Sequence, residues 1–277
     1  MPFDQLIEDS ERTVLRSGIK LKRAVQGVED ELFRRIMQFL RSMSTQGGRF
    51  VPDANSRRVL LSVRKELEGL LTKPIVDDAM RSILPDFDRI GANVQALHGE
   101  SNDIKVPKSL VTEQKARMVS EVKTSLFEAN YDARFADPVQ KTLFNHINFG
   151  ASLNETEKAI RAMVYGQDGG TGILSRYASQ VGRDSLSQFQ GRVHREVEVE
   201  HDLKWKRYVG NIIQDSRWQC RRWVRKQYLS NDELAREIRI AFRSGGGMIP
   251  GTTPATFCIH RGGYNCLHTA FPVRSPD

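Results

Sequence analysis

The stretch VDDAMRSILPDFDRIGANVQAL, residues 76–97, decides the fold class that the sequence predicts. Its apolar side chains recur at alternating steps of four and three residues, which places them on one face of an α-helix. They are Val76, Met80, Ile83, Phe87, Ile90, Val94 and Leu97. Pro85 falls inside the repeat, and we expect a kink or a short break of the helix there. Such stripes are typical of packing surfaces in helical bundles and indicate no cofactor site.

Apolar stripes with helical spacing also lie on both sides of this stretch. The first, which ends before TQGGRFVP at residues 45–52, consists of Leu21, Val25, Val28, Leu32, Ile36, Phe39 and Met43. The second lies on a helix predicted over 173–200 and consists of Leu174, Tyr177, Val181, Leu186, Phe189 and Val193. Further helices are predicted over 55–71, 110–130, 138–149 and from Asn154, which has capping-box spacing to Glu157. The polar residues 98–109 predict a loop, and we expect no strand before about residue 200.

The character of the sequence changes after residue 200. Residues 203–213, LKWKRYVGNII, are rich in β-branched and aromatic side chains and predict a strand. A short helix should follow within 215–229, then a helix over 231–244 capped by Ser230, and a final strand with Pro272 at its edge or just past it. The predicted fold is therefore mainly α. An extended helical body, with an N-terminal region over 1–100 and a central region over 101–200, precedes a small α+β module over 201–277.

The composition argues against a membrane-spanning protein and against a disulfide-rich one. Hydrophobic residues make up 39% of the 277 and charged residues 27%, and no apolar run is long enough to span a bilayer. The first residues, MPFDQLIEDSERTV, lack the apolar segment of a signal peptide, so we expect a cytosolic protein without a membrane partner. The three cysteines lie beyond residue 219 and predict no disulfide framework.

Positive charge is concentrated in one segment. The net charge is +8, and residues 204–226 contain eight Lys or Arg and one Asp, a net +7, together with all three tryptophans. Such a segment can face nucleic acid or an acidic protein surface. The alternative is a solvated helix face with tryptophans in a core behind it. The candidate contact residues are Lys204, Lys206, Arg207, Arg221, Arg222, Arg225 and Lys226.

The cysteines and a neighbouring histidine are candidate metal ligands. Cys220, Cys258, Cys266 and His268 could supply four tetrahedral donors to zinc, with His260 as a substitute. The segment has no Cys-x-x-Cys knuckle, and the alternative is that the cysteines are small core residues and the histidines are held by hydrogen bonds. A Cys-His nucleophile pair would need an orienting third group that the sequence does not mark. Zinc is the one cofactor that the sequence suggests.

Two blocks of the module carry a family resemblance. Two segments match the C-terminal signature of tailed-phage minor head proteins. In YVGNIIQDSRWQC the matching residues are Tyr208, Gly210, Asp215, Ser216, Arg217 and Cys220. In RGGYNCLHTAFPV they are Gly262, Gly263, Tyr264, Asn265, Cys266, His268, Pro272 and Val273. The chain resembles the Mu F-like, or head-morphogenesis, family over roughly its last quarter. Leu267 departs from the family, which usually has Arg there, and the first 150 residues show no such similarity.

The resemblance implies a structural part for the Cys/His motif. Gly262 and Gly263 would let the loop with Asn265 fold back on the Asp-Ser-Arg turn. Asp215 would cap the following helix, and Arg217 would bind a carboxylate or backbone carbonyls in a fork.

The implied function is that of a non-enzymatic minor head or portal-vertex protein. It would be present in several copies per virion, bound to portal or capsid protein near packaged double-stranded DNA. The alternative function is a zinc-dependent or Cys-His hydrolase-like phage effector. A DNA-binding regulator is disfavoured because residues 231–244, the candidate recognition helix, are nearly balanced in charge.

Overall fold

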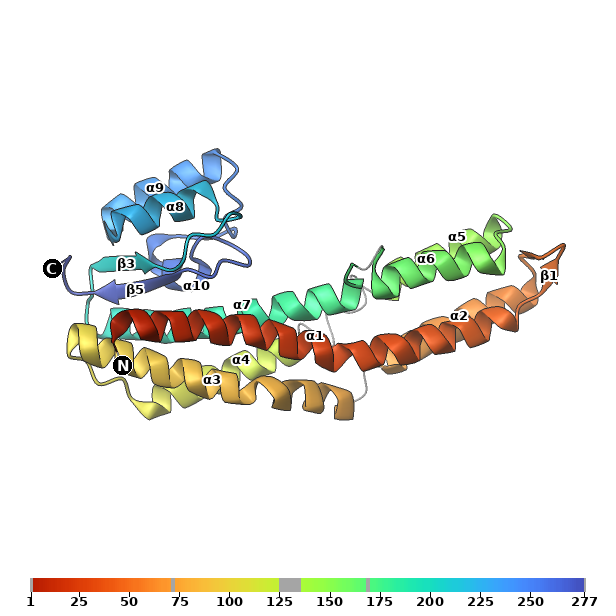
Figure 1. The fold of residues 1–277 in the computed structure, drawn as a ribbon, viewed down its shortest axis with the longest axis horizontal. Coiled ribbons are helices and arrows are strands. Elements are labelled where there is room, and N and C mark those ends of the chain that lie inside the picture. Colours follow the sequence, from red (N-terminus) through yellow and green to blue (C-terminus); the bar gives the residue numbers. More distant parts are fainter. Residues whose placement is uncertain (1, 71–72, 125–135, 168–169, 277) are drawn as a thin grey trace. The chain divides into compact units, whose positions relative to one another are not determined.

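The computed structural model of the chain describes residues 2–70, 73–124, 136–167 and 170–276. It is mainly α, with a small α+β module at the C-terminus, as the sequence predicts (Figure 1). The helices before residue 201 are α1 (Phe3–Arg41), α2 (Ala54–Leu70), α3 (Lys73–Asn102), α4 (Lys108–Thr124), α5 (Asp137–Asn148), α6 (Leu153–Tyr165) and α7 (Ile173–Glu200). Among the described residues, no helix is both long enough and apolar enough to cross a membrane.

Contacts between segments divide the chain into two compact units. The first unit consists of Met1–Gly18, Ile83–Ser120 and Gly182–Asp277, and the second of Ile19–Ser82 and Glu121–Val181. Each unit is built from segments that are distant in the sequence. The regions predicted from the sequence, 1–100, 101–200 and 201–277, are each continuous in the chain. The two units are defined by contacts instead, and each combines segments from more than one of these regions.

The helical stripes are buried. In α3, every stripe residue from Met80 to Leu97 is buried, and the Phe87 ring meets that of Phe189 in α7 at a centroid distance of 5.3 Å. In α1, Leu32 and its stripe neighbours are buried except for the half-buried Phe39. The residues 125–130 of the helix predicted after Leu110, and the side chain of Val76, lie outside the described part of the chain.

Helix α3 is longer than the sequence suggested. It continues without a break through Pro85 and ends at Asn102, so the expected loop over 98–109 is confined to residues 103–107. The reason is that buried polar side chains extend the apolar stripe by one more turn. Asn102 Nδ2 donates to His98 Nδ1 at 3.1 Å and to Pro272 O at 3.0 Å, which fixes the last turn against the C-terminal strand.

A short hairpin contradicts the expectation that strands occur only after residue 200. Strands β1 (Thr45–Gln46) and β2 (Arg49–Phe50) pair antiparallel around Gly47 and Gly48. Both glycines have positive φ, 59° and 76°, which a two-residue hairpin turn of type I′ requires. Flanking strands of two residues are too short to show as an alternating pattern.

The cap of α6 also differs from the prediction. Ser152 caps this helix, and not Asn154 as expected. The Glu155 backbone N–H donates to Ser152 Oγ, and the Glu155 carboxylate accepts from the Ser152 backbone N–H at 2.7 Å. The helix therefore begins two residues earlier than the position that the sequence favoured.

The C-terminal module, residues 201–277, folds around a three-stranded antiparallel sheet. Its elements are β3 (Trp205–Val209), α8 (Trp218–Lys226), β4 (Tyr228–Ser230), α9 (Asn231–Arg243), the 3₁₀ turn η3 (Pro254–Thr256), α10 (Phe257–His260) and β5 (Thr269–Val273). The strand order is β4-β3-β5, so β5 is an edge strand, and it pairs with β3 (Figure 1). The predicted final strand is present, and Pro272 is its last residue but one. Ser230 caps α9, also as predicted. A buried cluster that includes Tyr208, Trp223 and Phe257 forms the core.

Candidate metal centre

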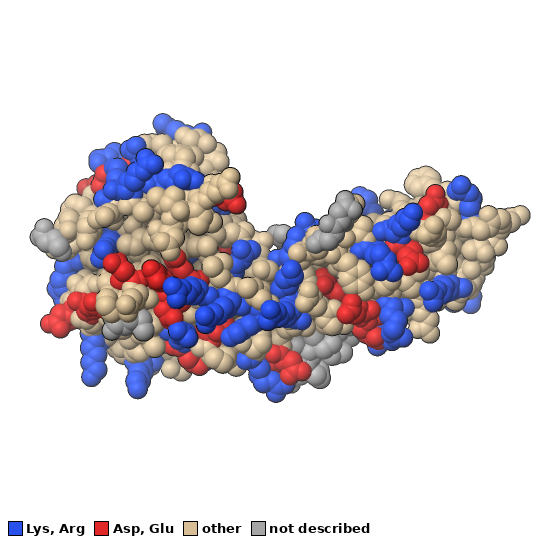
Figure 2. Space-filling model, in the orientation of Figure 1, with Lys and Arg blue, Asp and Glu red and all other residues tan. Residues whose placement is uncertain are grey.

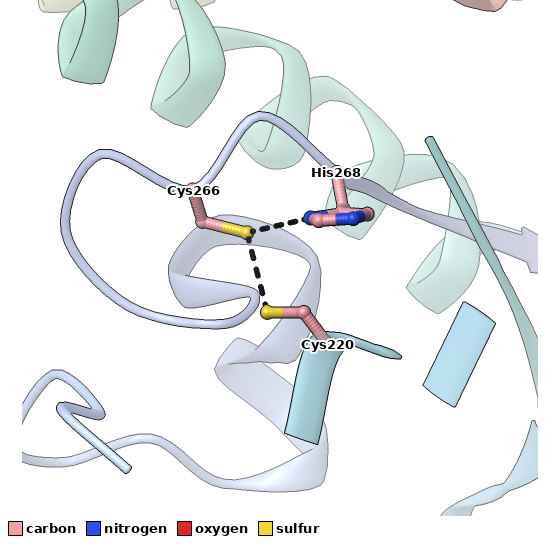
Figure 3. A group of neighbouring side chains, drawn as sticks. All are labelled: Cys220, Cys266 and His268. Carbon is pink, nitrogen blue, oxygen red and sulfur yellow. Dashed lines mark hydrogen bonds between the residues drawn. The ribbon is translucent and has the colours of Figure 1, made fainter. Parts of the chain in front are cut away.

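Three of the four candidate metal ligands come together in the module. Cys220 lies in α8, Cys266 in the loop between α10 and β5, and His268 immediately before β5, and their side chains point toward one another (Figure 3). The two sulfur atoms are 4.0 Å apart, and Cys266 Sγ lies 3.5 Å from His268 Nδ1. All three residues are buried, and their donor atoms lie within 4.8 Å of one another. We call this group the Cys220–Cys266–His268 cluster.

Tyr208 completes the surroundings of the cluster. Its hydroxyl lies 3.4 Å from both sulfur atoms, and its ring stacks on the His268 ring at a centroid distance of 5.5 Å. The side chain reaches the cluster from the central strand β3, where it is fully buried. Tyr208 belongs to the first motif block, and its presence beside the cysteines was not predicted.

The environment favours a thiolate on Cys266. The hydrogen bond from Cys220 lowers the pKa of the Cys266 thiol, and a hydrogen bond from His268 and the charge of Arg261 lower it further, against the opposing effect of burial. The pKa of Cys220 is raised by its hydrogen bond to Cys266 and by burial. Of the two thiols, Cys266 is therefore the more acidic.

The glycine pair lets the loop cover the cluster closely. A Cβ atom on Gly262 would lie 2.3 Å from Cys220 Sγ and 3.0 Å from Cys266 Sγ, closer than atoms that are not bonded can approach. Gly263 has φ of 107°, and a Cβ there would lie 2.2 Å from the carbonyl oxygen of Gly247. Only glycine fits these positions without displacing the loop.

Arg217 joins the two motif blocks as the resemblance implied. Its Nη1 donates to the Gly262 carbonyl at 3.1 Å and its Nη2 to the Tyr264 carbonyl at 2.8 Å. Asn265, with φ of 58°, directs its backbone N–H to Asp184 Oδ1 at 2.9 Å. The loop is thus fixed on one side by a guanidinium group and on the other by a carboxylate.

Asp215 does not cap the helix that follows it. Helix α8 begins at Trp218 after the N-cap residue Arg217, which makes no side-chain cap hydrogen bond, and Asp215 is exposed. Arg221 holds the turn instead, because its guanidinium group donates to the backbone carbonyls of Ser216, Ile213 and Gln214 at 2.7–2.9 Å. The expected cap role of Asp215 is therefore wrong.

The cluster forms part of the wall of a pocket. This hollow, of about 310 Å³, is also lined by Arg183, Asn211, Asp215, Arg217 and Asn265. The lining combines polar and charged side chains with the sulfur and imidazole donors of the cluster. Water and small polar ligands can therefore be accommodated beside Cys266 and His268.

Cys258 does not belong to the cluster. It is buried in α10 and its thiol donates to Glu198 Oε2 at 3.6 Å. Burial raises the pKa of this thiol. His260, the proposed substitute ligand, lies instead with its Nδ1 3.1 Å from Thr252 Oγ1. The four-ligand set expected from the sequence is therefore reduced to three residues, because α10 directs Cys258 toward α7.

Part of the basic segment is internal. The side chain of Lys206 is 0% exposed, and its Nζ lies 2.9 Å from Glu198 Oε1. Arg207 places its guanidinium group 4.0 Å from the centre of the Phe3 ring. Lys206 is therefore no surface contact residue, because the inward face of β3 buries it, and Arg207 is half-buried.

On the surface of the module, three of the candidate contact residues pair with carboxylates. Arg222 donates two hydrogen bonds from Nε and Nη2 to the Glu237 carboxylate at 2.9 Å, and Lys226 pairs with Glu237 and with Glu233. Lys204 is exposed and pairs with Asp202. Figure 2 shows Lys and Arg side chains gathered over the region of α8 and α9. Arg225 is exposed in α8, and it is the candidate contact residue least engaged with the rest of the module.

The tryptophans divide between core and surface. Trp223 is fully buried, and its Nε1 donates to Glu237 Oε2 at 3.1 Å. Trp218 is 40% exposed and shares a shallow surface hollow with Arg221, Arg222 and Arg225. Trp223 thus fills the core, as expected if the basic segment is a solvated helix face. Trp218, in contrast, is accessible beside arginines.

Comparisons with known proteins gave no match. No family model, no curated protein and no solved structure matches the chain.

Proposed function

We propose that the chain is a non-enzymatic structural protein of a tailed-phage head, a minor head or portal-vertex component bound to portal or capsid protein. On this proposal it is present in several copies per virion and assembles in the host cytoplasm. Its basis is the resemblance of the two C-terminal motif blocks to the Mu F-like, or head-morphogenesis, family. The module over 201–277 would act as a compact clamp that fixes the chain in the head.

One observation carries the proposal. The residues on which the resemblance rests meet in space, although forty residues, 221–260, which include β4 and α9, separate the two blocks in the sequence. Arg217 of the first block donates to two carbonyls of the second, and Cys220 of the first lies against Cys266 of the second. A motif whose parts form one packed unit is what a shared structural module requires.

The surface beside this unit suits a protein partner. Trp218 lies beside three arginines, and Ile213 and Tyr264, 52% and 47% exposed, both line the pocket at the cluster. Tryptophan, tyrosine and arginine are the side chains that dominate binding energy at protein interfaces. We therefore place the portal or capsid contact on the surface around Trp218 and Arg225.

The hydrolase-like alternative has weaker support. Cys266 Sγ and His268 Nδ1 are 3.5 Å apart, which a nucleophile and its base would need. However, His268 Nε2 is buried without a hydrogen-bond partner among the described residues. A catalytic imidazole is normally oriented by a third group at this nitrogen.

Incorporation into heads tests the proposal. The tagged chain is co-produced with any portal and capsid proteins that are encoded near its own gene, and heads are separated by sedimentation. We expect the wild-type chain to sediment with heads and the variant Trp218→Ser/Arg225→Gln to be incorporated much less. Leu61→Ser, which also removes an exposed apolar side chain, is the matched control. A wild-type chain that stays in the unassembled fraction would refute the proposal.

Duplex DNA binding is measured separately on the purified chain in rising salt. Each Lys or Arg that neutralises a phosphate contributes about 0.9 to the log–log salt slope. A slope that falls by about this amount in Arg225→Gln would assign the surface around Arg225 to packaged DNA. An unchanged slope together with lost incorporation would assign it to a protein partner.

A further inference from the structure

We propose that the Cys220–Cys266–His268 cluster is a zinc site with three protein ligands. The ligand atoms are Cys220 Sγ, Cys266 Sγ and His268 Nδ1, and a water molecule from the adjoining pocket occupies the fourth position. This inference rests on the geometry of the module and does not depend on a function in the phage head.

The distances within the cluster match a tetrahedral zinc centre. Zn–S bonds of about 2.3 Å and Zn–N bonds of about 2.05 Å at tetrahedral angles separate two sulfurs by about 3.8 Å and a sulfur from a nitrogen by about 3.6 Å. The distances are 4.0 Å between the two sulfurs and 3.5 Å between Cys266 Sγ and His268 Nδ1. The third distance, from Cys220 Sγ to the His268 ring, is within 4.8 Å. Small side-chain adjustments would bring all three donors to bonding distance.

The cluster contains donors that the protein itself leaves unsatisfied. His268 is buried, its Nε2 has no partner among the described residues, and its Nδ1 has only a sulfur atom as partner. Buried polar groups normally have nitrogen, oxygen or water partners, because an unpaired one is costly. A metal ion at Nδ1 would replace this weak sulfur contact with a strong bond, and two thiolates would balance the charge of the ion, while Nε2 would keep its proton.

The surroundings favour thiolate ligands and fix their positions. Burying a negative sulfur atom is less costly near a positive charge, and the buried Arg261 supplies such a charge near Cys266. The Tyr208 hydroxyl, 3.4 Å from both sulfurs, can donate a hydrogen bond to a metal-bound thiolate. Zinc binds thiolates, so any proton on either cysteine passes to solvent when the ion binds.

The donor set selects the metal. Two thiolates and an imidazole in a compact tetrahedral arrangement suit Zn²⁺, whereas Mg²⁺ and Ca²⁺ prefer oxygen ligands. Three protein ligands leave one position for water, and the pocket of about 310 Å³ beside the cluster has room for it. The metal would also link α8 to the loop before β5, so that binding stabilises the folded module.

The test uses the full chain purified without chelator, and its zinc content is measured by elemental analysis. We expect about one zinc ion per chain. Replacement of zinc by Co²⁺ should give the visible absorption of tetrahedral cobalt and a near-ultraviolet band from sulfur-to-cobalt charge transfer. Cys220→Ser, Cys266→Ser and His268→Gln should each lose the metal, and circular dichroism shows whether each variant is folded.

Cys258→Ser is the matched control, since it removes a buried cysteine that lies outside the cluster. It should retain the wild-type zinc content and the wild-type cobalt spectrum. Loss of zinc in this variant while it remains folded would overturn the three-residue assignment. Folded wild-type protein that contains no zinc and takes up neither Zn²⁺ nor Co²⁺ would overturn the proposal without reference to any variant.

Discussion

Lys206 Nζ lies 2.9 Å from Glu198 Oε1, with the lysine side chain 0% exposed and the glutamate 5% exposed. The pair links β3 to the end of α7, and Arg195 and the Cys258 thiol also contact the Glu198 carboxylate. A further hydrogen bond joins Lys206 Nζ to Asn231 Oδ1 at 3.1 Å. This lysine is thus part of the interior of the module, although it lies in the most basic segment of the sequence.

Loss of this pair should destabilise the first unit. In Lys206→Met the carboxylate of Glu198 keeps its contact with Arg195 but loses its fully buried partner. Removing one member of a buried ion pair costs about 3–5 kcal/mol, and the remaining arginine places the expected loss toward the lower end. We expect a loss of this size in the free energy of unfolding, measured by denaturant titration. Lys204→Met is the matched control, since this exposed lysine should contribute within about 0.5 kcal/mol. Equal effects of the two substitutions would contradict the internal role of Lys206.

The carboxylate of Glu237 should make stability depend on pH. Burial alone would raise its pKa, but hydrogen bonds from Arg222, Lys226 and Trp223 outweigh burial and lower the pKa to about 2. Between the ordinary pKa of 4.5 and this value the unfolded state binds more protons, so stability present above pH 4.5 is lost as the pH falls toward 2.

We therefore expect Glu237→Gln to be strongly destabilising at neutral pH and progressively less so below pH 4.5. The measurement compares the unfolding free energies of the two proteins as a function of pH, so that other titrating groups cancel. A difference that stays constant from pH 6 to pH 3 would show that the carboxylate contributes through its shape and not through its charge.

The close approach at Gly262 gives a third prediction. In Gly262→Ala the added methyl group would meet Cys220 Sγ at 2.3 Å and the Tyr208 hydroxyl at 3.0 Å. Overpacking of this kind costs about 1–3 kcal/mol. Gly99→Ala, in α3, adds a methyl group where no atom lies within 4 Å, and it should stabilise by about 0.5–1 kcal/mol. Thermal unfolding of both variants tests this contrast, and a stable Gly262→Ala would contradict the observed loop position.

The sequence predicted the helices because their burial is periodic. The helix over 173–200 and the stripe of α3 are found as expected, since one buried face determines each of them. Features that depend on one or two residues were missed, such as the hairpin at Gly47 and the cap at Ser152. Their signals are local and compete with similar residues nearby, as Asn154 competes with Ser152.

The candidate site was predicted in part. Cys220, Cys266 and His268 were identified, and the fork of Arg217 on two carbonyls followed from the resemblance. Cys258 was expected to be a ligand because it lies close to Cys266 in the sequence. This expectation was wrong, because α10 turns its side chain toward Glu198. The participation of Tyr208 could not be deduced, since it depends on which face of β3 meets α8.

The last prediction concerns the buried pair His98 and His194. Their rings share a hydrogen bond of 3.1 Å between Nε2 and Nδ1, and both pack against Phe271. Burial lowers the pKa of His98 to about 3 and that of His194 well below its ordinary value of 6.5.

Both rings stay neutral in the folded protein, whereas the unfolded chain takes up protons below pH 6.5. Stability should therefore fall as the pH drops from 6.5 toward 3, by up to about 1.4 kcal/mol per pH unit for each histidine. The variant His98→Gln, which keeps a polar side chain of similar reach, should remove the contribution of one histidine to this pH dependence of stability. Unfolding free energies of the wild type and this variant, measured at intervals from pH 7 to pH 4, test the prediction. Parallel curves over that range would show that His98 is protonated in the folded state, and would contradict the neutral pair.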